Sequence, residues 1–444
     1  MNVVVIGTGY VGLVTGLGFA KLGHRVACVD IDADKIAKLD RGEAPFFEPG
    51  LAELLCALQE AGGIVFTTDL SLVIADADLV MLAVGTPMGG DGAADLSHLF
   101  AAADAVGTRL DHEAVVVVKS TVPPGTNRRI LARVREVMSR AGRDHLAGLV
   151  QVASVPEFLR EGRALEDFFA PARIVIGAED DVVFALVDRL HEGIAAPRFR
   201  MSLESAELTK YAANAFLATK ISFVNEIANL AERTGADVRD VARAVGADPR
   251  IGDAFLQPGL GYGGSCFPKD VSALAQISGA SGYDFKLLSS VIETNNRQRD
   301  RFFRSVESDL APLKGRRVAV WGLTFKGGTD DVRESAALDL VGRLCARGAE
   351  VCAYDPRGMQ NAQRLLPDAV QFAQTAVDAA AGAEALLVLT DWPEFREVSF
   401  DAVYEAMVDR RIYDGRNLLA DLDLEGKGFA YQGVGLGKAV GSRQ

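Results

Sequence analysis

Residues 3–12 read VVVIGTGYVG, four β-branched apolar residues followed by glycines in the spacing GxGxxG. The apolar run is typical of a strand buried on both faces of a parallel sheet. In such a motif the first glycine allows a tight turn, the second lets a pyrophosphate approach the backbone, and the third lets a helix pack closely. We therefore predict a strand, a helix whose N-terminus binds phosphates, and between them a cofactor-binding turn formed by Gly7, Gly9, Tyr10, Val11 and Gly12.

An acidic residue after the next predicted strand indicates which dinucleotide is bound. Residues 26–29 are again short and apolar, and Asp30 follows them directly. A carboxylate at this position accepts hydrogen bonds from ribose hydroxyls and repels a 2′-phosphate, so the pattern favours NAD over NADP. Lys35 is a further candidate for the adenosine end, although a solvated helix face explains it almost equally well.

Strand-like and helix-like segments alternate beyond this motif, which predicts a doubly wound α/β domain. Further strands are expected at residues 79–84, 115–118, 149–153 and 173–176, and the clearest helices at 12–22 and 127–138.

The middle of the chain has a different pattern. Residues 203–234 contain no Pro or Gly and predict one long helix, and a second is expected at 286–310. The alternation then resumes near Lys314, where residues 348–355 resemble residues 23–30. The predicted fold class is α/β, with two Rossmann-like doubly wound domains joined by a long-helix linker. The expected domains are an NAD-binding domain at 1–200, a helical linker and dimerisation domain at 201–310, and a second nucleotide-binding domain at 311–444.

Composition excludes several classes of protein. The 444 residues are 49% hydrophobic and 24% charged, as in ordinary globular proteins, and the net charge of -13 disfavours a nucleic-acid partner. The five cysteines form no CxxC pair, so neither a disulfide framework nor a metal site is expected. No signal peptide precedes the first strand and no apolar run is long enough to span a membrane, so we expect a cytoplasmic protein without a membrane partner.

The stretch FLQPGLGYGGSCFPKD, residues 255–270, carries the strongest chemical signal. Its glycines remove side chains where a ligand or another backbone comes close. Pro268 favours the first turn of a helix, which places Cys266 at the helix N-terminus with Lys269 nearby, and both features favour a thiolate. Asp270 is expected on the same side of that helix.

A small buried side chain is the usual role of a cysteine. This interpretation suits four of the five, but a glycine-rich loop is not expected to form a core, so we assign a catalytic role to Cys266. None of the five histidines lies in these motifs, so the base is expected to be Lys, Asp, Glu or water. The cysteines interpreted as core residues are Cys28, Cys56, Cys345 and Cys352.

Three further pairs of polar residues are candidates, each with a simpler structural explanation. The residues of one pair lie in loops that follow predicted strands, where such folds bind ligands. These loops also contain Pro and Gly, so ordinary turns are the simpler explanation. The other two pairs are each spaced by one helical turn, for which a solvated surface is the alternative. The pairs are Thr86 with Thr121, Lys210 with Asn214, and Glu157 with Glu161.

Together these motifs resemble those of the UDP-glucose 6-dehydrogenases, within the wider nucleotide-sugar dehydrogenase family. The matching segments fall in the family's order from residue 7 to about residue 417 and cover nearly the whole chain. Dehydrogenases of acetylated sugars tend to carry His before the cysteine, where this chain has Ser265, and Val155 stands where the family often has Asn. The segments are GTGYVG, VGTP, STVPPGT, PEFLREG, TKYAANAF, DPRIG, FLQPGLGYGGSCFPKD, GLTFKGGTDDVRES, YDP and DGRN.

The resemblance implies a four-electron oxidation of UDP-glucose to UDP-glucuronate with NAD as cofactor. The C6 alcohol becomes an aldehyde, Cys266 forms a thiohemiacetal and then a thioester, and water releases the carboxylate. By the same resemblance Lys210 and Asn214 serve the oxyanion, with Lys210 also a candidate acceptor of the alcohol proton, and Asp270 positions water. The C-terminal domain would bind the UDP sugar, and Arg250 would reach the site of a partner subunit, which implies a homodimer.

Further ligand contacts follow from the resemblance. Glu161 and Thr121 would order a water molecule near the sugar. The cofactor set adds Thr86, Thr121, Glu161, Lys269 and Arg333 to the glycine turn, Asp30 and Lys35. The substrate set is Glu157, Phe158, Leu159, Arg160, Glu161, Lys210, Asn214, Arg250, Phe255, Leu256, Gln257, Pro258, Gly259, Gly263 and Lys326.

Two alternatives remain at this point. The same mechanism serves another sugar nucleotide, such as GDP-mannose. A non-catalytic regulatory protein that binds NAD or UDP is the other possibility, against which the set of Cys266, Lys210 and Asp270 argues.

Overall fold

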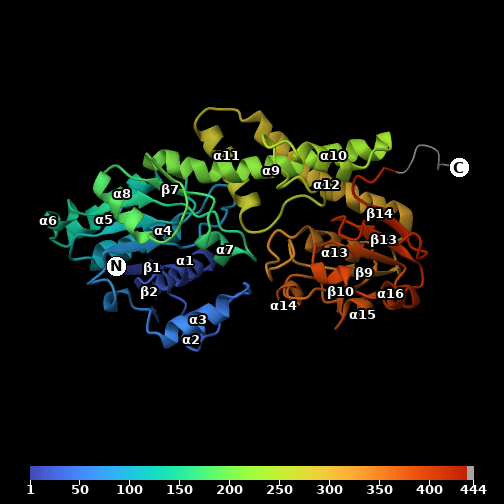
Figure 1. The fold of residues 1–444 in the computed structure, drawn as a ribbon, viewed down its shortest axis with the longest axis horizontal. Coiled ribbons are helices and arrows are strands. Elements are labelled where there is room, and N and C mark those ends of the chain that lie inside the picture. Colours follow the sequence, from blue (N-terminus) through green and yellow to red (C-terminus); the bar gives the residue numbers. More distant parts are fainter. Residues whose placement is uncertain (438–444) are drawn as a thin grey trace. The chain divides into compact units, whose positions relative to one another are not determined.

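The structure is a computed structural model that describes residues 1–437. It divides into two compact units, residues 1–213 and the residues from 214 onward, and the division falls inside the long helix α9 (Leu203–Thr234). Each unit contains one large sheet, as Figure 1 shows. Within the described residues, no helix has the length and apolar character needed to cross a membrane.

An eight-stranded sheet forms the centre of the first unit, in the order β3-β2-β1-β4-β5-β6-β7-β8. Neighbouring strands are parallel except β6 and β7, which are antiparallel. Val3 and Val5 of β1 join the core on one face of the sheet, and Val4 and Ile6 join the core on the other. The strands are β1 (Asn2–Ile6), β2 (Arg25–Val29), β3 (Ile64–Thr67), β4 (Leu79–Leu82), β5 (Val115–Val118), β6 (Gln151–Ser154), β7 (Ile174–Gly177) and β8 (Arg198–Met201).

Helices cover both faces of this sheet, as in a doubly wound domain. One core includes side chains of α1, α3, α7 and α8, and the core on the opposite face includes side chains of α4 and α5. The helices are α1 (Tyr10–Lys21), α2 (Ala33–Asp40), α3 (Leu51–Glu60), α4 (Ser97–Arg109), α5 (Thr126–Arg140), α6 (Asp144–Ala147), α7 (Ala164–Phe169) and α8 (Asp181–Leu190), with the 3₁₀ turn η1 (Leu70–Leu72).

The second unit combines helices with a six-stranded parallel sheet, in the order β11-β10-β9-β12-β13-β14. After α9 come α10 (Val238–Gly246), α11 (Phe267–Ala280) and α12 (Lys286–Leu310). The strands are β9 (Arg317–Trp321), β10 (Glu350–Tyr354), β11 (Gln371–Phe372), β12 (Ala385–Val388), β13 (Arg411–Asp414) and β14 (Ala430–Gly433). Between them lie α13 (Ala336–Ala346), α14 (Met359–Gln363), α15 (Ala376–Ala380), η2 (Pro393–Arg396) and α16 (Phe400–Ala406).

The two sheets begin with the same strand order, 3-2-1-4-5-6 when strands are numbered within each unit. Each first strand is followed directly by a glycine of positive φ, Gly7 (99°) and Gly322 (90°). The N–H of each glycine donates to the end of the second strand, to Val29 O at 2.7 Å and to Tyr354 O at 2.8 Å. The predicted fold class and internal repeat are therefore confirmed, whereas the domain limits at 200 and 310 stay predictions.

Some local expectations were wrong. The strand expected at 79–84 ends at Leu82, and the helix expected from residue 12 begins at Tyr10, because Gly9 already serves as its N-cap. Cys56 is exposed rather than buried, since α3 turns Leu55 and its other apolar residues inward and the next position faces out. Cys345 is only partly buried, whereas Cys28 and Cys352 are buried as expected.

Candidate active site

The glycine turn between β1 and α1 has the shape that a dinucleotide requires. A Cβ on Gly7 would lie 2.8 Å from the Ala83 carbonyl oxygen, and one on Gly12 would overlap the Gly7 carbonyl oxygen. Around Gly9, in contrast, no atom lies within 4 Å of the Cβ position, so the backbone is open to a ligand. Gly9 is the N-cap of α1 and no side chain caps this helix, so its first N–H groups can serve a pyrophosphate.

Asp30 follows β2 and is bonded to the same turn. Its Oδ2 accepts the N–H and the hydroxyl of Thr8, both at 2.8 Å, and the ammonium of Lys35 at 2.9 Å. Partial burial opposes ionisation, but these hydrogen bonds lower the pKa of Asp30, so the carboxylate is charged at neutral pH. A charged acceptor at this position fits the ribose of NAD, and Lys35 lies against the carboxylate.

Tyr10 and Glu48 hold the segment that follows β6. The Tyr10 hydroxyl donates to buried Glu48, which also accepts the N–H groups of Gly162 and Ala164, each at 2.7 Å. Burial and the neighbouring carboxylate raise the pKa of Tyr10, so its hydroxyl remains a donor. Glu48 was not predicted from the sequence, where it stands before Pro-Gly and looks like part of a turn.

The loops after β4 and β5 meet at the carboxyl edge of the sheet. The Thr86 hydroxyl donates to the Thr121 carbonyl oxygen at 2.9 Å, and the Ser120 hydroxyl donates to Val84 O at 2.6 Å. The structure thus brings together the two predicted threonines, at the edge where parallel α/β folds bind ligands.

A buried cluster of charges lies in the first unit. Glu157 and Lys210, 6% and 4% exposed, form an ion pair of 2.9 Å, and Glu157 also accepts the Leu159 N–H at 2.6 Å. Burial opposes ionisation, but Lys210, this N–H and the charge of Lys119 lower the pKa of Glu157. Lys119 is a second buried ammonium beside one carboxylate, so the cluster carries an excess positive charge suited to a developing anion.

Lys119 was missed in the sequence, where the available signal was a lysine at the end of a run of four valines. Burial lowers the pKa of Lys119 to about 8, an effect that Glu157 opposes and Lys210 reinforces. The charge of Lys119 also contributes to the lowered pKa of buried His191, after the larger effect of burial. Lys119 therefore occupies a place where its positive charge is costly to the fold.

Replacing Lys119 by Met is expected to stabilise the protein at pH 7, by on the order of 3 kcal/mol. Since the pKa of an unfolded lysine is about 10.4, the unfolded chain holds this proton more tightly than the fold does. The cost is fully present below pH 8 and fades as the pH rises from 8 towards 10, so the advantage of Lys119→Met should fade in parallel. Urea unfolding at pH 7 and pH 10 measures this, with exposed Lys38→Met as control, and a pH-independent difference would contradict it.

Cys266 is the N-cap of α11 and Pro268 lies in the first turn, as the sequence predicts. The thiol is partly buried, and the Ser265 hydroxyl lies 3.5 Å from its sulfur. The N-terminal end of a helix carries partial positive charge, an environment that favours a thiolate. The thiol thus lies where the sequence predicts it, and its catalytic role stays a prediction.

Asp270 links this cysteine to α9. It is 1% exposed, and its Oδ2 accepts the Asn214 amide at 2.6 Å while its Oδ1 accepts Lys269 Nζ at 2.5 Å. The Asp270 N–H donates to the Cys266 carbonyl oxygen at 2.8 Å, one helical turn away. The structure thus brings together three residues with predicted catalytic roles, Cys266, Asp270 and Asn214, and places Lys269 against Asp270.

The glycine-rich loop before Cys266 is largely buried, contrary to the expectation that it would not belong to a core. Leu260 lies in the core of the second sheet, and a Cβ on Gly264 would lie 2.7 Å from the Phe325 ring. Gly264 also has a positive φ of 82°. Close packing against neighbouring segments therefore accounts for Gly264, whereas the sequence had left open whether a ligand or another segment comes close.

Side chains of α9 and α12 hold this loop in place. Asn225 accepts the Gly259 N–H at 2.8 Å, and Gln298 donates to the Gly259 carbonyl oxygen at 2.9 Å. Neither residue was predicted from the sequence. The available signal was the position of Asn225 on α9, about three helical turns after Asn214 and hence on the same face.

The remaining predicted ligand residues are arranged as follows. Arg160, Arg250 and Arg333 pair with nearby aspartates at 2.5, 2.6 and 2.7 Å. The ammonium groups of Lys210 and Lys326 lie 5.4 and 5.5 Å from the ring centres of Phe158 and Phe325. Leu256, Pro258 and Gly259 are buried, Gln257 is exposed, and Leu159, Phe255 and Gly263 are intermediate. Contacts of these residues with a ligand stay predictions.

The fold and its groups define a class of protein: a dehydrogenase with an NAD-binding Rossmann domain, a second nucleotide-binding domain and a thiol at a helix N-terminus. The chain belongs to the UDP-glucose/GDP-mannose dehydrogenase family, since three family models match it in order. The NAD binding domain matches residues 1–195, the central domain 204–297 and the UDP binding domain 319–421. The protein is therefore an NAD-dependent dehydrogenase, as its sequence motifs predicted.

Relatives span the whole chain. UDP-glucose 6-dehydrogenase YwqF of Bacillus subtilis is 44% identical, with 98% of both chains covered. A UDP-glucose 6-dehydrogenase of Pseudomonas aeruginosa is 43% identical, over 99% of this chain and 98% of that protein. The solved structure of a UDP-glucose dehydrogenase from the archaeon Pyrobaculum islandicum is 38% identical, covers 98% of this chain and 97% of its own, and has a TM-score of 0.90.

Proposed function

We propose that this enzyme oxidises UDP-glucose to UDP-glucuronate through a thioester on Cys266. The observation that carries the proposal is the partly exposed thiol at the N-cap of α11, bonded through its backbone to an Asp270 that also holds Asn214. Full-length similarity to proteins named UDP-glucose 6-dehydrogenase supports the choice of sugar. NAD, when bound at the glycine turn, supplies the hydride acceptor.

The thiol explains how one enzyme removes four electrons from one carbon. The C6 alcohol loses a hydride and a proton and becomes an aldehyde. The Cys266 thiolate adds to the aldehyde carbon, and the oxygen takes a proton to give a thiohemiacetal, which can lose a second hydride and proton. Water then adds to the resulting thioester, the C–S bond breaks, and the carboxylate and thiol are released.

The surrounding side chains have roles that match their environments. Lys210, in its positively charged buried cluster, stabilises the oxygen of the alcohol as it loses its proton. Asn214 directs an amide toward Asp270, and Asp270 orients the attacking water. Glu161 and Thr121 order a water molecule beside the sugar, and the glycine turn with Asp30 binds the cofactor.

A substrate panel with NADH absorbance as the readout tests the proposed function. UDP-glucose should give about two NADH per sugar, whereas GDP-mannose and acetylated UDP sugars should react far more slowly. Formation of one NADH per sugar with release of free aldehyde contradicts the thioester. A faster reaction with GDP-mannose contradicts the substrate.

Replacing Asp30 by Ala is expected to weaken NAD binding about tenfold and to reduce the preference for NAD over NADP. The substitution removes the charged acceptor for the ribose and the charge that repels a 2′-phosphate. Measurement of kcat/KM with both cofactors checks this, and Asp34→Ala removes a nearby exposed charge as the control. An unchanged ratio of the two values in Asp30→Ala rules out the ribose role.

We also propose that the enzyme is a homodimer formed through α9. Phe216, Phe223 and Leu230 are 66%, 55% and 56% exposed and recur every seven residues, which places them on one face of the helix. We call these three residues the α9 stripe. Large exposed apolar side chains in a row are typical of a protein interface. Lys220, between them in sequence, donates to Ile251 O and Gly252 O at 3.1 and 3.2 Å.

This contact bears on Arg250, which immediately precedes that backbone. Arg250 is exposed and pairs with Asp248 at 2.6 Å. A loop fixed to α9 through Lys220 presents Arg250 next to the α9 stripe, which supports its predicted reach into the site of a partner subunit.

Replacing Phe223 by Asp is expected to convert the dimer into monomers, because a carboxylate cannot be buried unpaired in an apolar interface. Light scattering measures the mass. Val182→Asp, at another exposed apolar residue, is the matched control and should remain dimeric. A monomeric wild type, or a dimeric Phe223→Asp variant, contradicts the proposed interface.

A further inference from the structure

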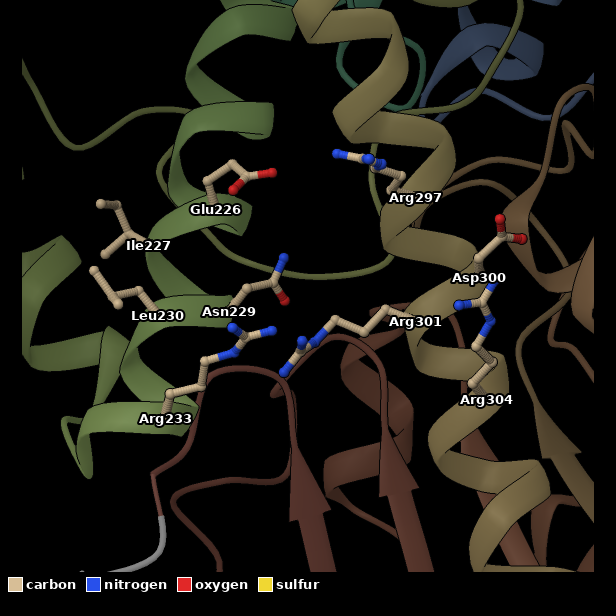
Figure 2. A pocket seen from close by; sticks show the side chains of 9 residues that line it. All are labelled: Glu226, Ile227, Asn229, Leu230, Arg233, Arg297, Asp300, Arg301 and Arg304. Carbon is tan, nitrogen blue, oxygen red and sulfur yellow. The ribbon is translucent and has the colours of Figure 1, made fainter.

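A large cavity between α9 and α12 has no role in the proposed reaction. It has a volume of about 960 Å³, and its lining residues all belong to the second unit. Four of them are arginines, Arg233 from α9 and Arg297, Arg301 and Arg304 from α12 (Figure 2). This volume is that of a site for an organic ligand rather than for a single small ion.

Two guanidinium groups in the cavity face each other. In Figure 2 the side chains of Arg233 and Arg301 extend from the two helices and point toward one another. Arg301 pairs with Glu232, whereas Arg233 and Arg304 form no ion pair with any residue of 1–437. Like charges that face each other across a cavity favour an anion between them.

Acidic neighbours compensate only part of this charge. Glu226 and Asp300 also line the cavity, but Asp300 is paired with Arg343 at 2.5 Å. Arg297 is paired with Glu293 at 3.2 Å. The lining therefore keeps an excess of positive charge, within a chain whose net charge is -13.

Two amide side chains beside the cavity hold each other in place. Asn229 donates through Nδ2 to Gln298 Oε1 at 3.0 Å, while its Oδ1 is shielded from solvent and accepts no hydrogen bond. Because Gln298 donates through Nε2 to Gly259, its oxygen faces Asn229, and this fixes the orientation of both amides. The Asn229 oxygen is closed to solvent in this arrangement, so the arginines are the groups that a ligand in the cavity can reach.

We propose that this cavity binds an organic phosphate. Its phosphate lies between Arg233 and Arg301. The cavity is far larger than one phosphate ion, so the organic part of the ligand fills the remaining volume. The site uses none of the residues assigned to the reaction, so it is an additional ligand site of the enzyme.

Calorimetric titration with glucose 6-phosphate tests the site, using the full chain saturated with NADH and UDP so that the cofactor and substrate sites are filled. The wild type should bind one molecule per chain, and Arg233→Gln should bind about tenfold more weakly or worse. Arg364→Gln removes an exposed arginine elsewhere in the second unit and should bind like the wild type. Absence of binding to the wild type, or unchanged binding to Arg233→Gln, overturns the proposal.

Inorganic phosphate separates the two parts of the recognition. The wild type should prefer glucose 6-phosphate to phosphate. Equal affinity of the wild type for both ligands overturns the assignment of an organic ligand. Because Leu230 also belongs to the α9 stripe, binding only to the monomeric Phe223→Asp variant shows that a second copy fills the cavity and overturns the proposal as well.

Discussion

Replacing Cys266 by Ser is expected to lower turnover at least about a thousandfold, because removal of a catalytic nucleophile typically costs that much or more. A serine hydroxyl is not ionised at neutral pH, so it gains little from the helix N-terminus that favours a thiolate. Binding of NAD and of the sugar nucleotide should be retained, since the side chain changes by one atom. Stopped-flow NADH absorbance gives turnover, and calorimetry gives the binding constants.

Cys56→Ser is the matched control for this substitution. Cys56 is exposed on α3, and its thiol donates a long hydrogen bond to the Gly42 carbonyl oxygen at 3.7 Å. The same chemical change at this position should therefore leave turnover unaltered. Turnover like that of the wild type in Cys266→Ser removes the thioester from the mechanism. Loss of nucleotide binding in that variant shows instead that the cysteine is structural.

The α/β architecture was predictable because the apolar runs of the buried strands and the glycine turns that follow them indicate the same fold. The valine run of β1 and the positive φ required at Gly7 specify a strand, a turn and a helix within one short segment. The second domain repeats this arrangement at Gly322, and Asp355 directly follows its second strand, β10. Such patterns lie within a few residues of one another, so the sequence displays them directly.

Asp30 and Asp355, which occupy equivalent positions in the two domains, show that such patterns do not predict the environment of a side chain. Asp30 keeps partial exposure beside the glycine turn, whereas Asp355 is fully buried. Asp355 accepts the N–H groups of Leu323 and Gly358 at 2.7 and 2.6 Å, and the indole N–H of Trp392 at 3.1 Å. The same residue at the same strand end is thus enclosed in one domain and partly exposed in the other, a difference decided by side chains distant in sequence.

Residues that act through long-range contacts were correspondingly harder to predict. Glu48 bonds to backbone at Gly162, and Asn225 to backbone at Gly259, in both cases across segments with no shared motif. Lys119 stands out only once its burial and its neighbouring charges are known. The sequence indicated the chemical groups, but the supports that position them depend on tertiary packing.

Replacing Lys210 by Met is expected to lower kcat by roughly a hundredfold to a thousandfold, the usual effect of removing one group that stabilises a developing oxyanion. The KM for NAD should change little, because Lys210 contacts Glu157 rather than the glycine turn. Loss of one partner from a buried ion pair commonly costs about 3–5 kcal/mol of stability. Here the positive charge of Lys119 remains beside Glu157, so we expect a smaller loss and a folded variant.

A second variant separates catalysis from stability. Lys210→Met combined with Glu157→Gln removes both charges of the pair, so no carboxylate is left buried without its partner. Stability should therefore recover relative to Lys210→Met, as urea unfolding can measure, whereas kcat should stay low because the ammonium is still missing. Recovery of kcat together with stability would show that Lys210 only balances the charge of Glu157. A low kcat in a stable double variant, together with a higher kcat in Glu157→Gln alone, leaves the oxyanion role as the reason the chain keeps a lysine in this buried position.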